Sequence, residues 1–395
     1  MPSAADRIRA LYSFDLKLGA TRICDIAWHQ VVGLAAAGAD VIAFPASICK
    51  AVPESVRVRP TLACDCFRLP QKPFGRLAYA ALHDRIVARR LESLKDSVDI
   101  IHTWPISSLR TLKTARKLGV PTVLERCNTH TRFAYTVVEE ECKRLGVVLP
   151  RKHEHAYNAK ILQKEESEYE EAFRILCPSD FVLKTFLDQG CDREKLVRHT
   201  YGFDPSRFYP LEAPRTTKEG LKMLFVGVNA VRKGVHFALE AWLCSPVSRS
   251  GSFSIAGEFL PAYAQKLSGM LTHPSVKVLG HRNDIPDLMR QSDILVLPSI
   301  EEGFGLVVAE AMASGCVPLI SDACTDICKH MYNGLVHRAR DIASLTEHIS
   351  MVDADRALLA QLRAAAIDSS QSFTWTAAGK KLVEIYQQVL DSWKG

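Results

Sequence analysis

The chain has 395 residues, 47% of them hydrophobic and 24% charged, which is the composition of a folded globular protein and excludes a disordered chain. No run of 18 apolar residues occurs, so no membrane-spanning helix is predicted, and the first 19 residues lack the apolar core of a signal peptide, which favours a cytoplasmic protein. The net charge of +6 is mild, and we expect no nucleic acid partner.

The charge is unevenly distributed along the chain. Residues 1–210 contain 32 Lys and Arg against 25 Asp and Glu, whereas residues 211–395 contain 18 against 19. A basic first half fits a domain that meets an anionic partner, although a chance difference between two domains is the alternative. The twelve cysteines are scattered, many of them in apolar runs, and no second ligand pair occurs at zinc spacing, so we expect reduced thiols and no metal site.

Short apolar strands alternate with amphipathic helices, which predicts an α/β fold with doubly wound parallel sheets. In the first half we expect strands at 7–14, 40–44, 99–102, 121–124, 175–177 and 197–199, helices at 23–37 and 107–118, and a charged helical stretch over 134–173. In the second half we expect strands at 222–226, 252–256, 275–279, 293–297 and 317–321, and helices at 235–243, 285–291 and 307–314.

A segment rich in proline and charge, residues 204–220, indicates a linker between two units. The predicted domains are therefore a Rossmann-like unit over 1–205, a second over 206–372, and a C-terminal helix over 373–395. Ligands of such sheets bind beyond the carboxyl ends of the strands, so the expected site is the cleft between the two units.

The strongest motif follows the expected strand at 293–297. Glu302 and Glu310 are separated by seven residues, and Gly303 and Gly305 follow the first of them. The glycines allow a tight turn that directs a helix N-terminus towards the cleft, where its N–H groups favour an anion such as a diphosphate. The two carboxylates could accept hydrogen bonds from two sets of hydroxyl groups. Alternatively, one caps the helix and the other is solvated.

This motif resembles the signature of family-4 glycosyltransferases, which are retaining enzymes of the GT-B fold, with two Rossmann-like domains facing across a cleft. The resemblance implies that Glu302 contacts the donor sugar and Glu310 the ribose of the nucleotide. It extends to a loop in which Lys233 would hold the donor diphosphate. The family's arginine usually follows Gly227 directly, but this chain has valine there, and Arg232 is the candidate replacement.

The resemblance also assigns residues of the first half. Gly19 matches the first glycine of the family's Gly-Gly loop, whereas alanine replaces the second. Histidines at strand tips are candidates for the site, or are structural hydrogen-bonding groups. The resemblance implies three sets of site residues. The catalytic residues would be Glu302, Lys233, Arg232 and His130, and the acceptor-side residues would be His102, Arg126 and Asn128. The donor-binding residues would be Gly19, Gly227, Arg232, Lys233, Glu302, Gly303, Phe304, Gly305, Leu306 and Glu310.

The implied function is transfer of a sugar from a nucleoside-diphosphate sugar to an acceptor hydroxyl, in polysaccharide, glycolipid or small glycoside biosynthesis, without metal or cofactor. The basic first half suggests an anionic or lipid-linked acceptor and peripheral contact with the inner membrane face. Residues 68–90 could provide that contact through Arg85, Arg89 and Arg90, or could form a core-facing helix with solvated arginines.

Two other functions remain open. One is a sugar-nucleotide epimerase of the same fold, although no acid–base pair for it is recognisable. The other is a catalytically silent nucleotide-sugar-binding protein, because Ala20 and Val228 depart from the family pattern. A dehydrogenase is disfavoured, since no Gly-x-Gly-x-x-Gly follows the first strand.

Overall fold

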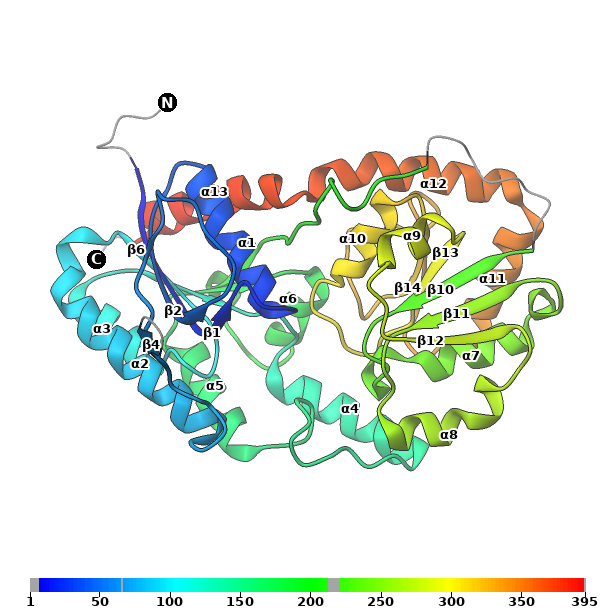
Figure 1. The fold of residues 1–395 in the computed structure, drawn as a ribbon, viewed down its shortest axis with the longest axis horizontal. Coiled ribbons are helices and arrows are strands. Elements are labelled where there is room, and N and C mark those ends of the chain that lie inside the picture. The colour runs from blue at the N-terminus through cyan, green and yellow to red at the C-terminus, as the bar shows by residue number, and fades with distance from the viewer. Residues whose placement is uncertain (1–6, 65–66, 212–219, 394–395) are drawn as a thin grey trace.

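The computed structural model describes residues 7–64, 67–211 and 220–393, so residues 212–219 of the expected linker lie outside the described part. Two parallel sheets lie side by side, each between layers of helices (Figure 1). The predicted α/β class with two parallel sheets is therefore confirmed. Among the described residues, no helix is long and apolar enough to cross a membrane.

The first sheet has the order β3-β2-β1-β6-β7-β8-β9. Its strands are β1 (Arg9–Leu18), β2 (Asp40–Ile48), β3 (Arg57–Val58), β6 (Ile100–Thr103), β7 (Thr122–Glu125), β8 (Arg174–Cys177) and β9 (Leu196–Arg198). A separate antiparallel hairpin joins β4 (Ala63–Cys64) to β5 (Phe67–Arg68). The helices of this unit are α1 (Ile23–Ala36), α2 (Gly75–Leu94), α3 (Leu109–Leu118), α4 (Thr131–Leu145), α5 (Ala159–Glu171) and α6 (Asp180–Leu187).

The second sheet has the order β12-β11-β10-β13-β14-β15. Its strands are β10 (Lys222–Val226), β11 (Ser252–Ala256), β12 (Val276–Gly280), β13 (Ile294–Leu297), β14 (Val317–Ser321) and β15 (Leu335–His337). Its helices are α7 (Val235–Cys244), α8 (Pro261–Leu271), α9 (Ile285–Arg290), α10 (Leu306–Ala313), α11 (Ile342–Ala354) and α12 (Arg356–Ser370). Every residue of β13 and β14 is buried, as expected of parallel strands covered on both faces.

The last helix, α13 (Trp375–Ser392), runs from the second unit back onto the first (Figure 1). It crosses α1 where two glycines meet, because a Cβ on Gly379 would lie 2.7 Å from the Cα of Gly33. Tyr386 then reaches into the first unit, where its hydroxyl lies 2.7 Å from Nδ1 of His102. This contact ties the end of the chain to the core of the first unit.

The charged stretch over 134–173 differs from the expectation. It forms two helices, because Gly146 adopts φ 68° and ends α4, and Asn158 accepts hydrogen bonds from Lys160 N and Ile161 N to begin α5. The loop between them carries His155, which reaches Glu301 of the second unit.

Helix α2 packs its apolar side inward. Val87 and Leu91 are buried, whereas Arg85, Arg89 and Arg90 face solvent. The structure thus favours the core-facing interpretation of this helix.

Candidate active site

The site lies where the loops after β10 and β13 meet. The loop after β10 passes through a short 3₁₀ turn, Val231–Lys233, and reaches Gly234 at φ 69°. A Cβ at Gly234 would lie 2.0 Å from the carbonyl oxygen of Pro298, so only glycine fits there. This close approach holds the turn that carries Arg232 and Lys233 against the loop that carries Glu302.

Lys233, Arg232 and Glu302 are brought together, as predicted. The ammonium of Lys233 forms an ion pair with Glu302, and Nη1 of Arg232 lies 3.5 Å from Oε2 of the same carboxylate. Burial and the adjacent Arg232 lower the pKa of Lys233 to about 7. Arg232 and Lys233 therefore present two basic side chains that a diphosphate can contact, while Glu302 and the neighbouring Glu301 offset their charge.

The N-terminus of α10 faces the same place. Gly305, at φ 67°, is its N-cap residue, and no described side chain caps the helix there. The first N–H groups are therefore available to an anion. Further along α10, burial raises the pKa of Glu310 to about 7, which Arg207 partly opposes. Phe304 is buried with its ring centroid 5.5 Å from that of Tyr201, so it packs the interior of the loop.

Sequence reasoning missed Glu301, which joins the two units. This carboxylate is fully buried and accepts hydrogen bonds from Oγ1 of Thr129 at 2.8 Å and Nε2 of His155 at 3.2 Å, both from the first unit. From the second unit, Nη1 of Arg232 lies 3.4 Å away. Burial alone would raise the pKa of Glu301, but His155 and Arg232 hold it well below its usual range. The one available signal was a second acid directly before Glu302.

Gly303 provides another close contact between the units. A Cβ at this position would lie 1.7 Å from the carbonyl oxygen of Cys127 in the first unit. No side chain can be accommodated unless the units separate.

We therefore expect Gly303→Ala to lower the rate of sugar transfer at least tenfold by preventing this approach. The matched control is Gly269→Ala, because Gly269 lies in α8 with no atom within 4 Å of its added Cβ. That substitution should leave transfer unchanged and raise thermal stability slightly, since alanine is the better helix former. Equal transfer rates for both variants would show that the close contact at Gly303 is not needed for transfer.

The predicted acceptor-side residues Arg126 and Asn128 line a cavity of about 690 Å³ in the first unit. Nη1 of Arg126 lies 3.1 Å from Glu165, and its Nε and Nη2 donate to the carbonyl oxygen of Thr129. Arg126 thus holds the loop that also carries the partner of Glu301. Gly19 adopts φ 82°, and a Cβ there would lie 2.3 Å from that of Lys50, so it shapes the turn after β1.

The structure does not bring His130 and His102 to this site. Nδ1 of His130 caps α4 by accepting from Arg132 N at 3.2 Å, and its ring packs between Tyr169 and Phe186. Burial together with Arg126 and Arg132 lowers the pKa of His130 to about 3. His102 is fully buried, between Tyr386 and Glu125. Both residues therefore fit the alternative in which a histidine at a strand tip is a structural hydrogen-bonding group.

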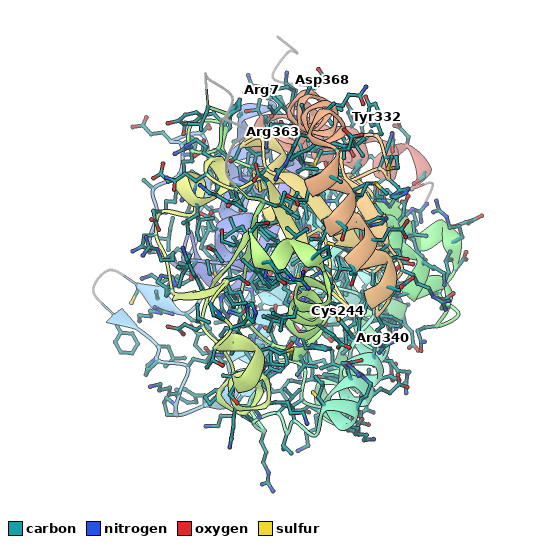
Figure 2. The ribbon with its side chains drawn as sticks, turned by 90° about the vertical axis from the view of Figure 1, so that its right-hand side faces the viewer. Arg7, Cys244, Tyr332, Arg340, Arg363 and Asp368 are labelled. Carbon is teal, nitrogen blue, oxygen red and sulfur yellow. The ribbon has the colours of Figure 1, made fainter. Side chains whose placement is uncertain are left out.

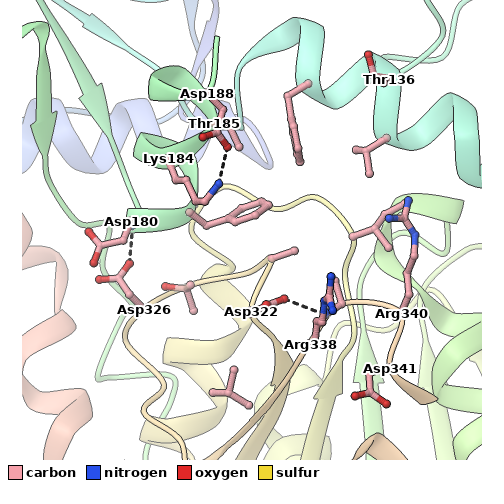
Figure 3. A pocket seen from close by; sticks show the side chains of 18 of the residues that line it. Thr136, Asp180, Lys184, Thr185, Asp188, Asp322, Asp326, Arg338, Arg340 and Asp341 are labelled. Carbon is pink, nitrogen blue, oxygen red and sulfur yellow. Dashed lines mark hydrogen bonds and ion pairs between the residues drawn. The ribbon is translucent and has the colours of Figure 1, made fainter. Parts of the chain in front are cut away.

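A larger cavity, of about 1140 Å³, lies between α4 and α6 on one side and the loops after β14 and β15 on the other (Figure 3). Charged side chains of its lining bridge the two units. Asp326 accepts from Asp180 N at 2.9 Å and pairs with Arg198 at 2.7 Å, while Nε of Arg340 lies 2.9 Å from Glu141 of α4. Since these charges already have partners, we place no substrate here.

The part of the chain that carries these residues resembles a known family. Residues 220–355, which contain Lys233, Glu302 and Glu310, match the family described as glycosyl transferases group 1. The likeness to this family therefore lies in the second half of the chain. The predicted recognition is confirmed, and the matched residues coincide with the unit that holds the expected donor site.

Two curated relatives and one solved structure extend the comparison. The chain is 31% identical over 122 residues to N,N'-diacetylbacillosaminyl-diphospho-undecaprenol α-1,3-N-acetylgalactosaminyltransferase of Campylobacter jejuni, covering 30% of this chain and 32% of that protein. It is 25% identical over 287 residues to UDP-Gal:α-D-GlcNAc-diphosphoundecaprenol α-1,3-galactosyltransferase of Escherichia coli, covering 67% of this chain and 68% of that protein. Sucrose-phosphate synthase from Thermosynechococcus elongatus has a TM-score of 0.70 at 18% identity, covering 98% of this chain and all of that one. The similarity to this structure confirms the GT-B fold.

Proposed function

We propose that this protein is a group 1 glycosyltransferase, which transfers a sugar from a nucleoside-diphosphate sugar to an acceptor hydroxyl with retention of configuration. One observation carries the proposal: Arg232, Lys233 and Glu302 meet at the strand ends, in the loop that leads into the uncapped N-terminus of α10. Cations and helix N–H groups there would stabilise the diphosphate as it leaves. Glu302 would orient the donor sugar, and Glu310 would accept hydrogen bonds from the ribose.

The basic side chains of this site also support catalysis without metal. Arg232, Lys233 and the helix N-terminus supply the electrostatic stabilisation that a divalent cation would otherwise provide. We expect transfer to be unchanged after chelation with EDTA. A loss that added Mg²⁺ or Mn²⁺ restores would refute metal independence without refuting the transferase.

The cavity of about 690 Å³ in the first unit is the proposed acceptor site. It combines apolar lining, including Phe14, Trp104 and Ile106, with basic residues. The two curated relatives carry names that place undecaprenol diphosphate in their acceptors. We propose an acceptor of that chemical class, an anionic lipid-linked sugar, which also explains the basic excess of the first half.

The test begins with a thermal-shift screen of nucleoside diphosphates and their sugars, because a ligand that binds only the folded protein raises its apparent stability. Radiolabelled donor is then incubated with lipid-linked acceptors. Transfer with retained anomeric configuration supports the proposal. Interconversion of the donor sugar without acceptor would indicate an epimerase, and tight donor binding with neither transfer nor hydrolysis would indicate a silent binding protein.

We expect Glu310→Ala to weaken binding of the nucleoside diphosphate about 10- to 100-fold, since hydrogen bonds to a charged group contribute roughly 1.5–3 kcal/mol each. Isothermal titration calorimetry measures this. In the protein without ligand the pKa of Glu310 is about 7, so the carboxylate form increases as the pH rises through neutrality. Because this form is the better hydrogen-bond acceptor, the affinity for the nucleoside diphosphate should fall on acidification. Glu310→Gln should lack this dependence. Any titration of the ligand phosphates is common to both proteins, so identical pH profiles would contradict the role of Glu310.

A further inference from the structure

The mouth of the first-unit cavity carries exposed cations and aromatic rings. Lys72 lines the cavity from the segment before α2, and Arg151 and Lys152 line it from the loop before α5. Phe74 lies two residues from Lys72 and is 51% exposed; Tyr157 lies between two lining residues and is 63% exposed. We call these five residues the mouth patch.

The chain places Tyr157 at this mouth by a direct contact as well. Its ring packs edge-on against Tyr135, a lining residue, with the centroids 5.6 Å apart. Phe74 directly precedes Gly75, which also lines the cavity. Neither ring is needed to fill a core, because more than half of each side chain remains in solvent. Exposed aromatic rings beside a cavity mouth indicate an interaction surface.

The charges of the lining separate into paired and unpaired groups. Inside the cavity, Arg76 pairs with Asp15, and Arg126 pairs with Glu165. Within the described ranges, Lys72, Arg151 and Lys152 have no ion-pair partner, and all three are exposed. The interior charges are compensated, and the rim is positive because its three cations outnumber Glu154, the one exposed acid of the described lining, which lies 3.6 Å from His155. A positive rim that also bears aromatic rings matches the interface of an anionic bilayer, where cations meet lipid phosphates and aromatic rings lie at the headgroup level.

We propose that the mouth patch binds an anionic lipid surface and holds the acceptor cavity against it. This inference rests on the proposed function, in which the acceptor is lipid-linked. Bound in this way, the cavity opens directly onto the headgroup region, so the sugar and phosphate groups of an acceptor enter without the lipid chain leaving the bilayer. This binding does not require the solvent-exposed face of α2 that carries Arg85, Arg89 and Arg90.

The test is co-sedimentation of the full chain with vesicles of phosphatidylcholine alone, or with about 30% phosphatidylglycerol, at about 0.05 M and about 0.5 M NaCl. The wild-type protein should pellet with the anionic vesicles and be released by salt. Each basic residue near such a surface contributes roughly a factor of five. The triple variant Lys72→Ser, Arg151→Ser, Lys152→Ser should therefore lower partitioning at least tenfold and remove the dependence on salt.

Two further variants complete the design. Phe74→Ser with Tyr157→Ser should lower partitioning several-fold and leave the salt dependence. The matched control is Lys329→Ser with Tyr332→Ser, an exposed cation and an exposed aromatic of the second unit, where Figure 2 shows Tyr332; it should partition like the wild type. The thermal shift given by a nucleoside diphosphate should be unchanged in every variant, which shows that each one folds.

Two outcomes would overturn the inference: equal binding of the wild type to neutral and anionic vesicles, or wild-type partitioning of the triple variant. These are separable from failure of the proposed function. A protein that binds donors but not vesicles refutes the mouth patch alone, whereas one that binds vesicles but transfers no sugar refutes the transferase.

Discussion

Replacing Lys233 with alanine is expected to lower kcat for sugar transfer about 100- to 1000-fold, the usual cost of removing one preorganised group that stabilises developing charge. The ammonium lies in a buried loop between Arg232 and Glu302, where a charge interacts more strongly than it would in water. As the sugar leaves, negative charge grows on the diphosphate, so the loss should fall mainly on kcat and less on donor binding. Steady-state kinetics with varied donor measure both.

The substitution also leaves Glu302 without its ion-pair partner, so stability has to be measured in parallel. A thermal melt shows whether the loss of rate exceeds any loss of folded protein. The control is Lys277→Ala, which removes an exposed lysine from β12 and should have no effect on either quantity. Undiminished kcat in Lys233→Ala would refute the proposed diphosphate site.

The meeting of Glu302 with Lys233 was predictable from sequence for a topological reason. Both follow parallel strands of one sheet, β13 and β10, which are hydrogen-bonded neighbours. The carboxyl ends of such strands share one edge, so short loops after them lie together whatever the side chains are. The glycines that allow the loops to pack are visible in the sequence as well.

The histidines were not predictable in this way. A place at the end of a strand fixes the position of a residue's backbone, but the direction of its side chain depends on the helices packed around it. His130 turns back to cap α4, where its ring packs against Tyr169 and Phe186. His102 contacts Tyr386 of α13, which lies 284 residues further along the chain. Contacts over such separations leave no local periodicity in the sequence.

Glu301 was missed for the same reason, although its carboxylate accepts hydrogen bonds from Thr129, His155 and Arg232. Its partners Thr129 and His155 lie 172 and 146 residues away in the first unit. His155 comes from the irregular loop between α4 and α5, within the stretch that the sequence predicted as helical. Unless the fold of that loop is known, nothing in the sequence distinguishes Glu301 from a solvated acid beside the motif.

We expect Glu301→Ala to lower transfer at least 100-fold and to lower the free energy of unfolding by about 3 kcal/mol, because it removes the buried carboxylate that His155 of the first unit and Arg232 of the second unit share. Binding of a nucleoside diphosphate should change less than transfer, since Glu310 and the N-terminus of α10 are untouched. The first unit would be held less firmly at the donor site, so kcat falls while donor affinity is largely kept. Glu139→Gln, an exposed acid of α4, is the control and should match the wild type.

A double-mutant cycle separates this interdomain role from a local one. Glu301→Gln keeps the shape of the side chain and loses its charge, and His155→Gln removes the partner in the first unit. If the two residues act through one contact, their effects on transfer should be non-additive by about 1–3 kcal/mol. Additive effects would show that Glu301 acts within the second unit alone, and an unchanged rate in Glu301→Ala would show that the contact has no part in transfer.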